Sequence, residues 1–279
     1  MKTAFVTALA GFCLTASLHA QPGTSRPAPP PPLVDNSFLL EEAYNQEPRV
    51  VQHIVTFAHA ARGRGWELAF EQEWPVSSMR HQLSFGIGLA HTRSRIGLRA
   101  SDLEMNYRYQ LLGMAEDARV LLAPRLSLVL PTGTVREGTG RGGTGFSAGM
   151  PLSIVLAPRV TTHTNVGVTY FPKLDAGDGL DAHGLDAAVG QSVIWFARPT
   201  LHLMLESLWT REETRVTPLD GRRLESAEES FLLSPGIRKA FNLRSGAQLV
   251  PGIAFPIEMT GELSKKPGVF VYLSFEHGF

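Results

Sequence analysis

The sequence predicts an all-β protein in which about twelve strands close into a single antiparallel β-barrel, behind an N-terminal signal peptide and a proline-rich leader. Three observations lead to this prediction. From about residue 49 onward, apolar and polar side chains alternate with period two, which is the periodicity of strands. The candidate strands are even in number and most run about ten to fourteen residues, whereas ordinary strands average about five or six. From the fifth strand onward, the connections alternate between long and short, as they do in membrane barrels, which have long loops at one end and short turns at the other.

The first residues predict export. Lys2 supplies a positive n-region, the apolar stretch AFVTALAGFCL follows, and TASLHA leads to a cleavage site after Ala20, so residues 1–20 are predicted to be a signal peptide. The bulky Phe12 before Cys13 argues against a lipoprotein anchor. Without the leader the chain contains no cysteine, which excludes disulfides and thiolate metal sites.

The segment between the signal peptide and the first strand has two parts. Residues 21–34, QPGTSRPAPPPPLV, predict a disordered and extended proline-rich leader. Residues 35–48 leave two alternatives open. In one, Asp35, Asn36 or Ser37 caps a short plug helix that enters or seals the mouth of the barrel. In the other, these residues are a loose lead-in to the first strand.

The barrel is predicted to occupy residues 49–279. Its alternation is plain in WELAFEQEW, where both tryptophans, the leucine and the phenylalanine share one face, and Glu67, Glu71 and Glu73 share the other. The predicted strands, in order, lie near residues 49–59, 65–75, 80–92, 99–112, 118–131, 143–157, 159–172, 183–197, 199–212, 228–241, 245–257 and 268–279.

The composition of the two faces predicts that the apolar face points outward. A soluble barrel buries its apolar face, whereas a membrane barrel turns it toward lipid. The polar faces carry charges and small residues, which suit a narrow, wet lumen. Aromatic residues lie near strand ends, as they do at membrane interfaces: Trp66, Trp74, Tyr170, Phe171, Trp195, Phe196 and Trp209. The sequence therefore predicts a transmembrane barrel in contact with outer-membrane lipid.

The C-terminal strand supports the same prediction. GVFVYLSFEHGF alternates up to its final residue, so Phe279 needs an apolar environment such as lipid. The ending resembles the terminal strand that the barrel-assembly machinery of Gram-negative bacteria recognises, with Phe275 and Phe279 as the signal residues. His277 departs from that pattern.

Two stretches carry a resemblance to a known family. DNSFLLEEAYNQEPRVVQHI, residues 35–54, and PRLSLVLPTG, residues 124–133, resemble Gram-negative outer-membrane proteins described as transporters or as the MetA pathway of phenol degradation. The resemblance implies an outer-membrane barrel that passes small, often hydrophobic, molecules.

The lumen is the candidate site. The predicted inward-facing residues are Glu67, Glu71, Glu73, Glu104, Asn106, Arg108, Arg125, His163, His202, Glu206 and Arg238. Two roles remain open for them: they pair across strands to stabilise the wall, or they sort solutes by charge and size. Twelve strands predict a narrow, partly obstructed pore. The predicted function is passive or facilitated uptake of small molecules, hydrophobic or aromatic ones among them. The alternative is a structural or adhesive barrel with a sealed lumen.

Two other motifs are weaker evidence for a binding site. GTGRGGTG, residues 138–145, has the spacing of a phosphate-binding loop, but a strand-like sequence follows it where a helix is needed, so an external loop is predicted. Asp175, Asp178 and Asp181 form a weak candidate cation loop that lacks a calcium-motif register.

Catalysis is a third alternative for the whole chain. An outer-membrane lipid hydrolase would use His163 or His202 with a serine and an acid. No catalytic residue, metal or cofactor is predicted. The net charge of zero gives no reason to expect nucleic acid as a partner.

Overall fold

The computed structural model describes residues 37–59, 65–92, 98–114, 118–175, 180–218, 224–260 and 267–279. The predicted signal peptide and proline-rich leader, and also Asp35, Asn36 and Asp178, lie outside these residues. No helix in the described part of the chain is long and apolar enough to cross a membrane.

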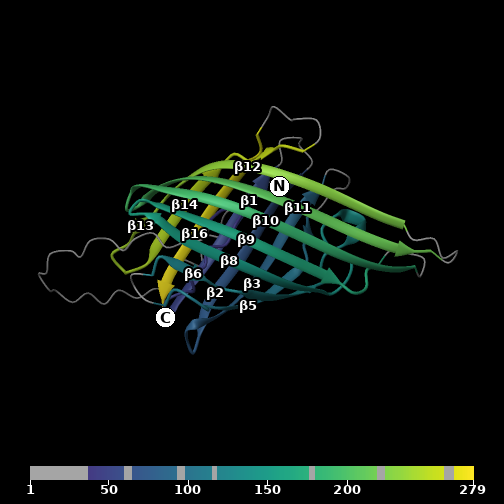
Figure 1. Ribbon diagram of the computed structural model, residues 1–279, viewed down its shortest axis with the longest axis horizontal. Helices are drawn as coiled ribbons and strands as arrows, with labels where there is room; N and C mark the ends of the chain where they lie inside the picture. Colours follow the sequence, from purple (N-terminus) through teal and green to yellow (C-terminus); the bar gives the residue numbers. More distant parts are fainter. Residues whose placement is uncertain are drawn as a thin grey trace, which may run out of the picture. The chain divides into compact units, whose positions relative to one another are not determined.

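One antiparallel sheet closes on itself and makes a barrel (Figure 1). Its twelve main strands are β1 (Val50–His59), β2 (Gly65–Val76), β3 (Ser78–Thr92), β5 (Leu103–Tyr109), β7 (Arg125–Leu130), β8 (Gly145–Ala157), β9 (Val160–Phe171), β10 (Asp181–Arg198), β11 (Leu201–Thr217), β12 (Leu224–Lys239), β14 (Gln248–Ala254) and β16 (Val269–Gly278). Short pieces complete it: β4 (Arg99–Ala100), β6 (Val120–Leu122), β13 (Phe241–Asn242), β15 (Ile257–Glu258) and the 3-10 turn η1 (Val135–Glu137). The prediction of an all-β, twelve-stranded antiparallel barrel is confirmed.

The last strand closes the barrel against the first. β16 pairs with β1 in an unbroken register from Val50 opposite Gly278 to His59 opposite Val269, and with β14 on its other side. The remaining seam is closed by β12, which pairs with β14. Because each main strand has two neighbours, the sheet presents no open edge along these strands.

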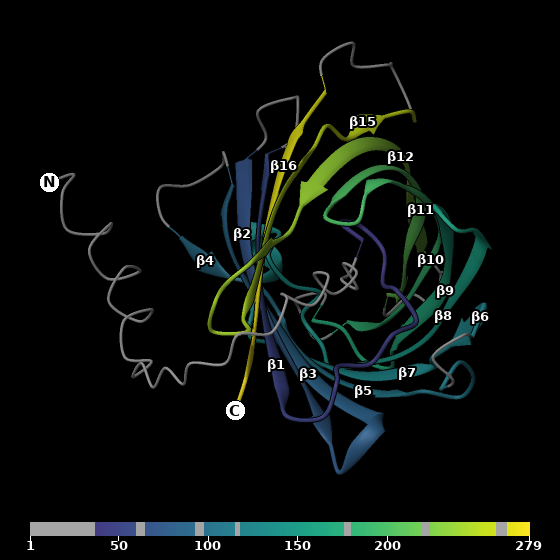
Figure 2. The same ribbon diagram turned by 90° about the vertical axis from the view of Figure 1, so that its left-hand side faces the viewer.

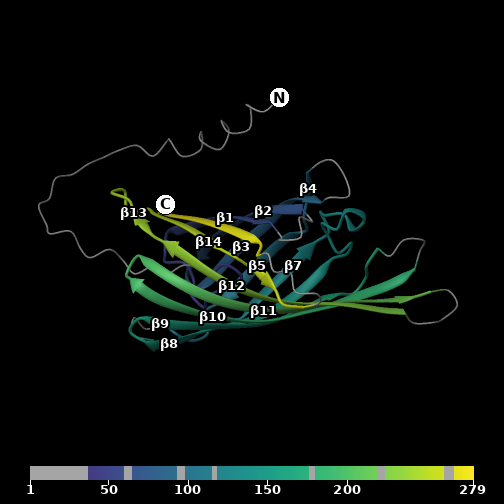
Figure 3. The ribbon, with the colours of Figure 1, turned by 90° about the horizontal axis from the view of Figure 1, so that it is seen from above.

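Alternate residues face opposite sides of the wall, and the apolar ones are outside. Met105 and Leu126 have exposed fractions of 52% and 62%, whereas Asn106 and Arg108 have 5% and 3%. Apart from buried apolar clusters, the interior of the barrel is therefore polar and its outside apolar, which is the reverse of a soluble barrel. β10, β11 and β12 are the longest strands and extend past the rest of the wall at one end (Figure 3).

Two predicted strands are interrupted. The range 99–112 divides into β4 and β5 because Asp102 uses its carboxylate to accept hydrogen bonds from the backbone N–H groups of Gly133 (2.9 Å) and Arg141 (2.8 Å). The range 118–131 divides at Pro124, which has no N–H to donate to the ladder. The loop 131–144, held by Asp102, contains residues 138–144 of the glycine-rich stretch 138–145, and β8 begins at its last residue, Gly145, so the predicted loop there is confirmed.

His277, which departs from the assembly-signal pattern, has a partner at the closing seam. Its ring stacks on that of His53 in β1, with 5.4 Å between ring centroids and 3.3 Å between the two Nε2 atoms. The ring of Phe275 lies 6.4 Å from that of His53 and 5.3 Å from that of His277. The three rings contact one another and form an aromatic cluster on the outside of the seam.

Residues 37–48 run inside the barrel, where the purple trace of Figure 2 crosses the space enclosed by the strands. They form no helix, so the predicted plug helix is not present, although the segment does lie in the lumen. We call residues 37–48 the luminal segment.

Candidate functional site

The backbone of the luminal segment is held by side chains of the wall. Its N–H groups donate to Glu206, Ser153, Gln110 and Gln82, from Leu39 (3.0 Å), Ala43 (2.8 Å), Asn45 (3.1 Å) and Gln46 (2.7 Å) respectively. Its carbonyl groups accept from Gln110 at Ala43 (2.8 Å) and from Arg108 at Glu42 (3.3 Å) and Tyr44. These wall residues come from separate parts of the sheet. The segment is irregular because its polar backbone groups are satisfied by the wall and need no helix.

Charged side chains fix the middle of the luminal segment. Glu42 is buried and forms an ion pair with Arg238 of β12 at 3.0 Å, and Nε2 of His163 lies 3.7 Å from the same oxygen. Glu41 pairs with Arg125 and, at 3.4 Å, with Arg108. Opposite charges in the segment and in the wall therefore neutralise each other inside the barrel.

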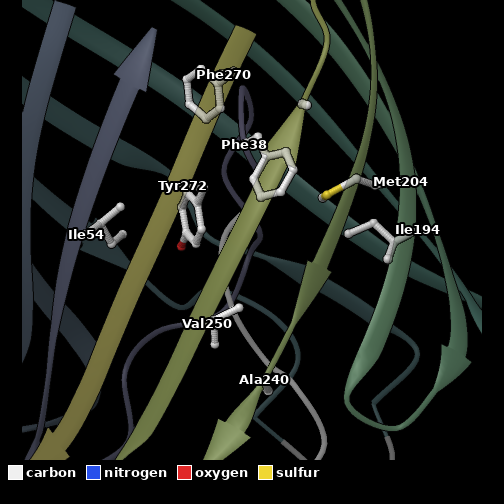
Figure 4. Close-up of a cluster of buried hydrophobic side chains, with 9 residues drawn as sticks. Phe38, Ile54, Ile194, Met204, Ala240, Val250, Phe270 and Tyr272 are labelled. Carbon is white, nitrogen blue, oxygen red and sulfur yellow. The ribbon is translucent and has the colours of Figure 1, made fainter.

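An aromatic anchor fixes the start of the segment. The ring of Phe38 packs against Phe270 (5.9 Å between centroids) and Tyr272 (5.2 Å) of β16 (Figure 4). Two wall glycines make room for it: a Cβ at Gly236 or Gly252 would come within 2.7 Å or 2.4 Å of the ring. The rest of this apolar cluster comprises Ile54, Ile194, Met204, Ala240, Val250 and Ala254.

The predicted inward-facing residues all lie on the polar side of the wall, and the segment contacts only some of them. Arg108, Arg125, His163, Glu206 and Arg238 contact the luminal segment directly. His202 stacks on Phe196 and lies 3.4 Å from Arg238, Asn106 donates to Ser84, and Glu73 pairs with Arg108 at 3.7 Å.

The structure adds uncharged groups that the sequence reading missed. Gln82, Gln110, Ser153 and Ser192 bind the segment, with Ser192 accepting from Ser37 at 3.2 Å. The sequence could have indicated them only through their positions, which alternate onto the inward face of strands that were already predicted. A segment with buried polar backbone needs such partners.

Glu67, Glu71 and Glu104 line a separate cavity of about 220 Å³. It lies beyond the segment, toward the end of the barrel where β1 finishes, because Glu67 pairs with Ala58 in the register of β1 and β2. Glu71 accepts a hydrogen bond from Ser84 at 3.0 Å, and Glu104 lies 3.3 Å from Arg125. Asp102 also lines the cavity, so four carboxylates border it, and Arg125 lies next to one of them.

A serine, a histidine and an acid do come together. Ser153 Oγ lies 2.7 Å from Nδ1 of His163, whose Nε2 faces Glu42. However, Ser153 has no exposed surface, and the N–H of Ala43 donates to its oxygen. Substrate could reach Ser153 only after the segment left, and the segment would take Glu42 with it. Hydrolysis needs both an accessible Ser153 and an acid beside His163, and the structure cannot provide the two at the same time.

The described residues contain no group of three or more histidine, cysteine, aspartate or glutamate side chains placed to hold a metal ion. Asp175 is exposed beyond β9 and Asp181 begins β10. The candidate cation loop has its third member, Asp178, outside the described residues.

No protein-family model matches the chain, and no curated protein matches it in sequence. Solved structures match it in fold. The COG4313 outer membrane channel from Pseudomonas putida F1 is 14% identical, with a TM-score of 0.62 over 85% of this chain and 98% of that one. The NanC porin is 8% identical, with a TM-score of 0.50 over 82% of this chain and all of that one. The resemblance to the MetA-pathway family stays a prediction. The twelve-stranded barrel of this chain is therefore similar in fold to an outer-membrane channel and to a porin.

Proposed function

We propose that the chain is an outer-membrane channel for small polar solutes and that the luminal segment is its gate. The observation that carries the proposal is the reversed burial of the barrel, with apolar side chains outside and polar ones inside. A closed sheet with an apolar belt suits a bilayer, because lipid cannot satisfy open backbone groups. A polar interior suits water and dissolved molecules. The fold shared with the two outer-membrane barrels supports the same function.

The contacts of the luminal segment favour a gate over a permanent seal. Most of them are hydrogen bonds and ion pairs, which water can replace when the segment leaves. The segment joins β1 through an exposed turn at residues 47–49, in which the N–H of Val50 donates to the carbonyl of Glu47 at 3.1 Å, and this turn would serve as the hinge. The space that it vacates would connect with the cavity at Glu67, Glu71 and Glu104, which lies against the same wall.

The lining supports polar solutes that carry one apolar or aromatic group. Carboxylates border the cavity, and Arg108, Arg125 and Arg238 would face the lumen once the segment has left. The cluster around Phe270 and Tyr272 would offer an apolar patch in the same wall. Such a lining suits small amphipathic or zwitterionic molecules better than purely apolar ones.

Reconstitution into planar bilayers tests the proposal. We expect the native chain to show rare openings and a variant with a weakened segment to show frequent ones. The sealed structural barrel makes the opposite prediction, with no current from either chain. A folded barrel, recognised by its different gel migration before and after boiling, that stays silent in both forms would refute the channel function.

Neutralising the cavity carboxylates is expected to shift ion selectivity toward anions. The triple variant Glu67→Gln, Glu71→Gln and Glu104→Gln removes negative charge that concentrates cations near the pathway, with little change in side-chain size. The reversal potential in a salt gradient measures the shift, which should shrink as ionic strength rises. Asp181→Asn, an exposed residue of β10 in the outward register, is the control. An unchanged reversal potential in the triple variant would place the solute pathway elsewhere.

Opening is expected to become more frequent as the pH rises from about 5 to 8. Burial raises the pKa of Glu42 from 4.5 to about 7, although Arg238 and Arg108 lower it. Between these two values the seated segment binds more protons than the released one, so a rise in pH weakens its seating. The total effect is on the order of 1–3 kcal/mol. The other groups that face Glu42 are His163, Glu206 and Tyr44.

Open probability, recorded across this pH range, measures the effect. The Glu42→Gln variant cannot titrate at this position and should show a flatter pH profile. If both chains show the same profile, another group controls the response.

A further inference from the structure

We propose that the seat of the luminal segment is a binding site for extended peptides supplied from outside the chain. The peptides would carry an aromatic residue followed four positions later by a glutamate, as Phe38 and Glu42 do. This inference rests on the gate proposed above, because the seat becomes free only when the segment leaves. The bound segment is then a tethered occupant of a site that a free peptide can enter.

The wall recognises the main chain of its occupant. Glu206, Ser153, Gln110 and Gln82 accept from four backbone N–H groups within residues 39–46. Gln110 and Arg108 donate to backbone carbonyls in the same stretch. These contacts require amide groups at peptide spacing and do not depend on side-chain identity. Main-chain hydrogen bonds of this kind supply affinity in sites that bind extended peptides.

Separate places in the wall recognise individual side chains. Gly236 and Gly252 leave the space that the Phe38 ring occupies, against Phe270 and Tyr272. Gly190 does the same for Leu40, since a Cβ there would lie 2.1 Å from the leucine side chain. Spaces that fit an aromatic ring and an aliphatic chain give the site its sequence preference.

A third place recognises acidic side chains. Arg238 lies 3.0 Å from the Glu42 carboxylate, and Arg125 and Arg108 pair with Glu41. A free peptide that replaced the segment would have to neutralise the same buried guanidinium groups, because an unpaired charge is costly inside the barrel. The ligand is therefore an acidic peptide and not a basic one.

The tether explains why the seat is normally occupied by the chain itself. A segment joined to β1 by a few residues has an effective concentration in the millimolar range, so a free peptide competes poorly with it. Weakening the segment by a change in the segment alone leaves the wall intact and removes this competition.

Binding of a labelled peptide to the full chain tests the inference. The probe is a fluorescent peptide with the native sequence of residues 37–48, SFLLEEAYNQEP. The matched control peptide has alanine at the positions of Phe38 and Glu42. We expect the probe to bind the full-length Phe38→Ala chain roughly tenfold or more tighter than the native chain, by fluorescence anisotropy. The control peptide should bind the same variant at least about tenfold more weakly than the probe.

The full-length Leu40→Ala chain serves as a second host, so that the test does not depend on one variant folding. Equal binding of the probe and the control peptide, or no binding to either folded host at about 1 mM peptide, would overturn the inference. Anisotropy does not require current. If the hosts conduct and the probe does not bind, only the peptide site is wrong. If the probe binds and the hosts stay silent, the channel function is wrong.

Block of the current separates two sources of peptide. The probe is added to one side of the bilayer at a time, with the orientation of the barrel known. Block from the end of the barrel where β1 begins and β16 ends indicates a peptide partner on that side. Block from the opposite side indicates a peptide solute that enters through the cavity at Glu67, Glu71 and Glu104.

Discussion

The Phe38→Ala variant is expected to shift the equilibrium between released and seated segments by roughly a hundredfold toward release. Phe38 is 7% exposed and is the aromatic anchor of the luminal segment. Truncating a buried phenylalanine removes its transfer free energy and leaves a cavity, at a cost of about 3 kcal/mol or more. Each 1.4 kcal/mol is about tenfold in an equilibrium constant, so the predicted change is about two orders of magnitude.

Open probability in planar bilayers measures this shift directly. The control is Phe146→Ala, the same truncation at an exposed position on the outside of β8, which should leave the gating unchanged. The anchor is a side chain of the segment and not of the wall, so the stability of the barrel itself should change little. A Phe38→Ala chain that has the same unfolding temperature as the native chain, and that opens no more often, would show that Phe38 does not hold the gate closed.

The barrel could be predicted from the sequence because its wall obeys a local rule. Period-two alternation fixes which side each residue faces, and so Asn106 and Arg108 could be placed inside from their neighbours Met105 and Tyr107 alone. The interruption at Asp102 could not be predicted, because its partners Gly133 and Arg141 are about thirty to forty residues away in the sequence. Hydrogen bonds between residues far apart in the chain produce no repeating pattern in the sequence.

The luminal segment escaped prediction for a related reason. Ser37 and the following glutamates are typical of a helix start, and a helix satisfies backbone groups locally. Here the wall offers side-chain partners at matching positions, and that competing set of hydrogen bonds is visible only when the barrel is closed. The predicted residues His163, Glu206 and Arg238 were inward by periodicity, but their common partner was not predictable from their own strands.

The Arg238→Met variant is expected to weaken the seated state by about 3–5 kcal/mol at pH 8. Its guanidinium is 1% exposed and lies 3.0 Å from Glu42, which is also buried. Removing one partner of a buried ion pair leaves the other charge without its compensation, and this costs more than the pair itself contributes. The segment should therefore leave the lumen more often, and the open probability should rise.

A matched pair of variants separates buried charge from charge in general. Arg125→Met removes another guanidinium that pairs with the same segment, but its side chain is 21% exposed and that of Glu41 is 25% exposed. Partly solvated pairs contribute about 1 kcal/mol or less, so this variant should open only slightly more often than the native chain. Equal effects of the two variants would argue against burial as the cause.

Changing Glu42 as well should rescue the Arg238→Met variant. With Glu42→Leu added, no charge remains buried at this position, and replacing a buried pair by apolar residues of similar size is often neutral or stabilising. A double-mutant cycle on open probability should then give a coupling of about 2–3 kcal/mol between positions 42 and 238.

The Arg238→Met variant should also lose most of its effect at pH 5, because a protonated Glu42 needs no cationic partner. A variant that opens equally often at pH 5 and pH 8, and that Glu42→Leu does not rescue, would mean that Arg238 stabilises the wall and not the gate.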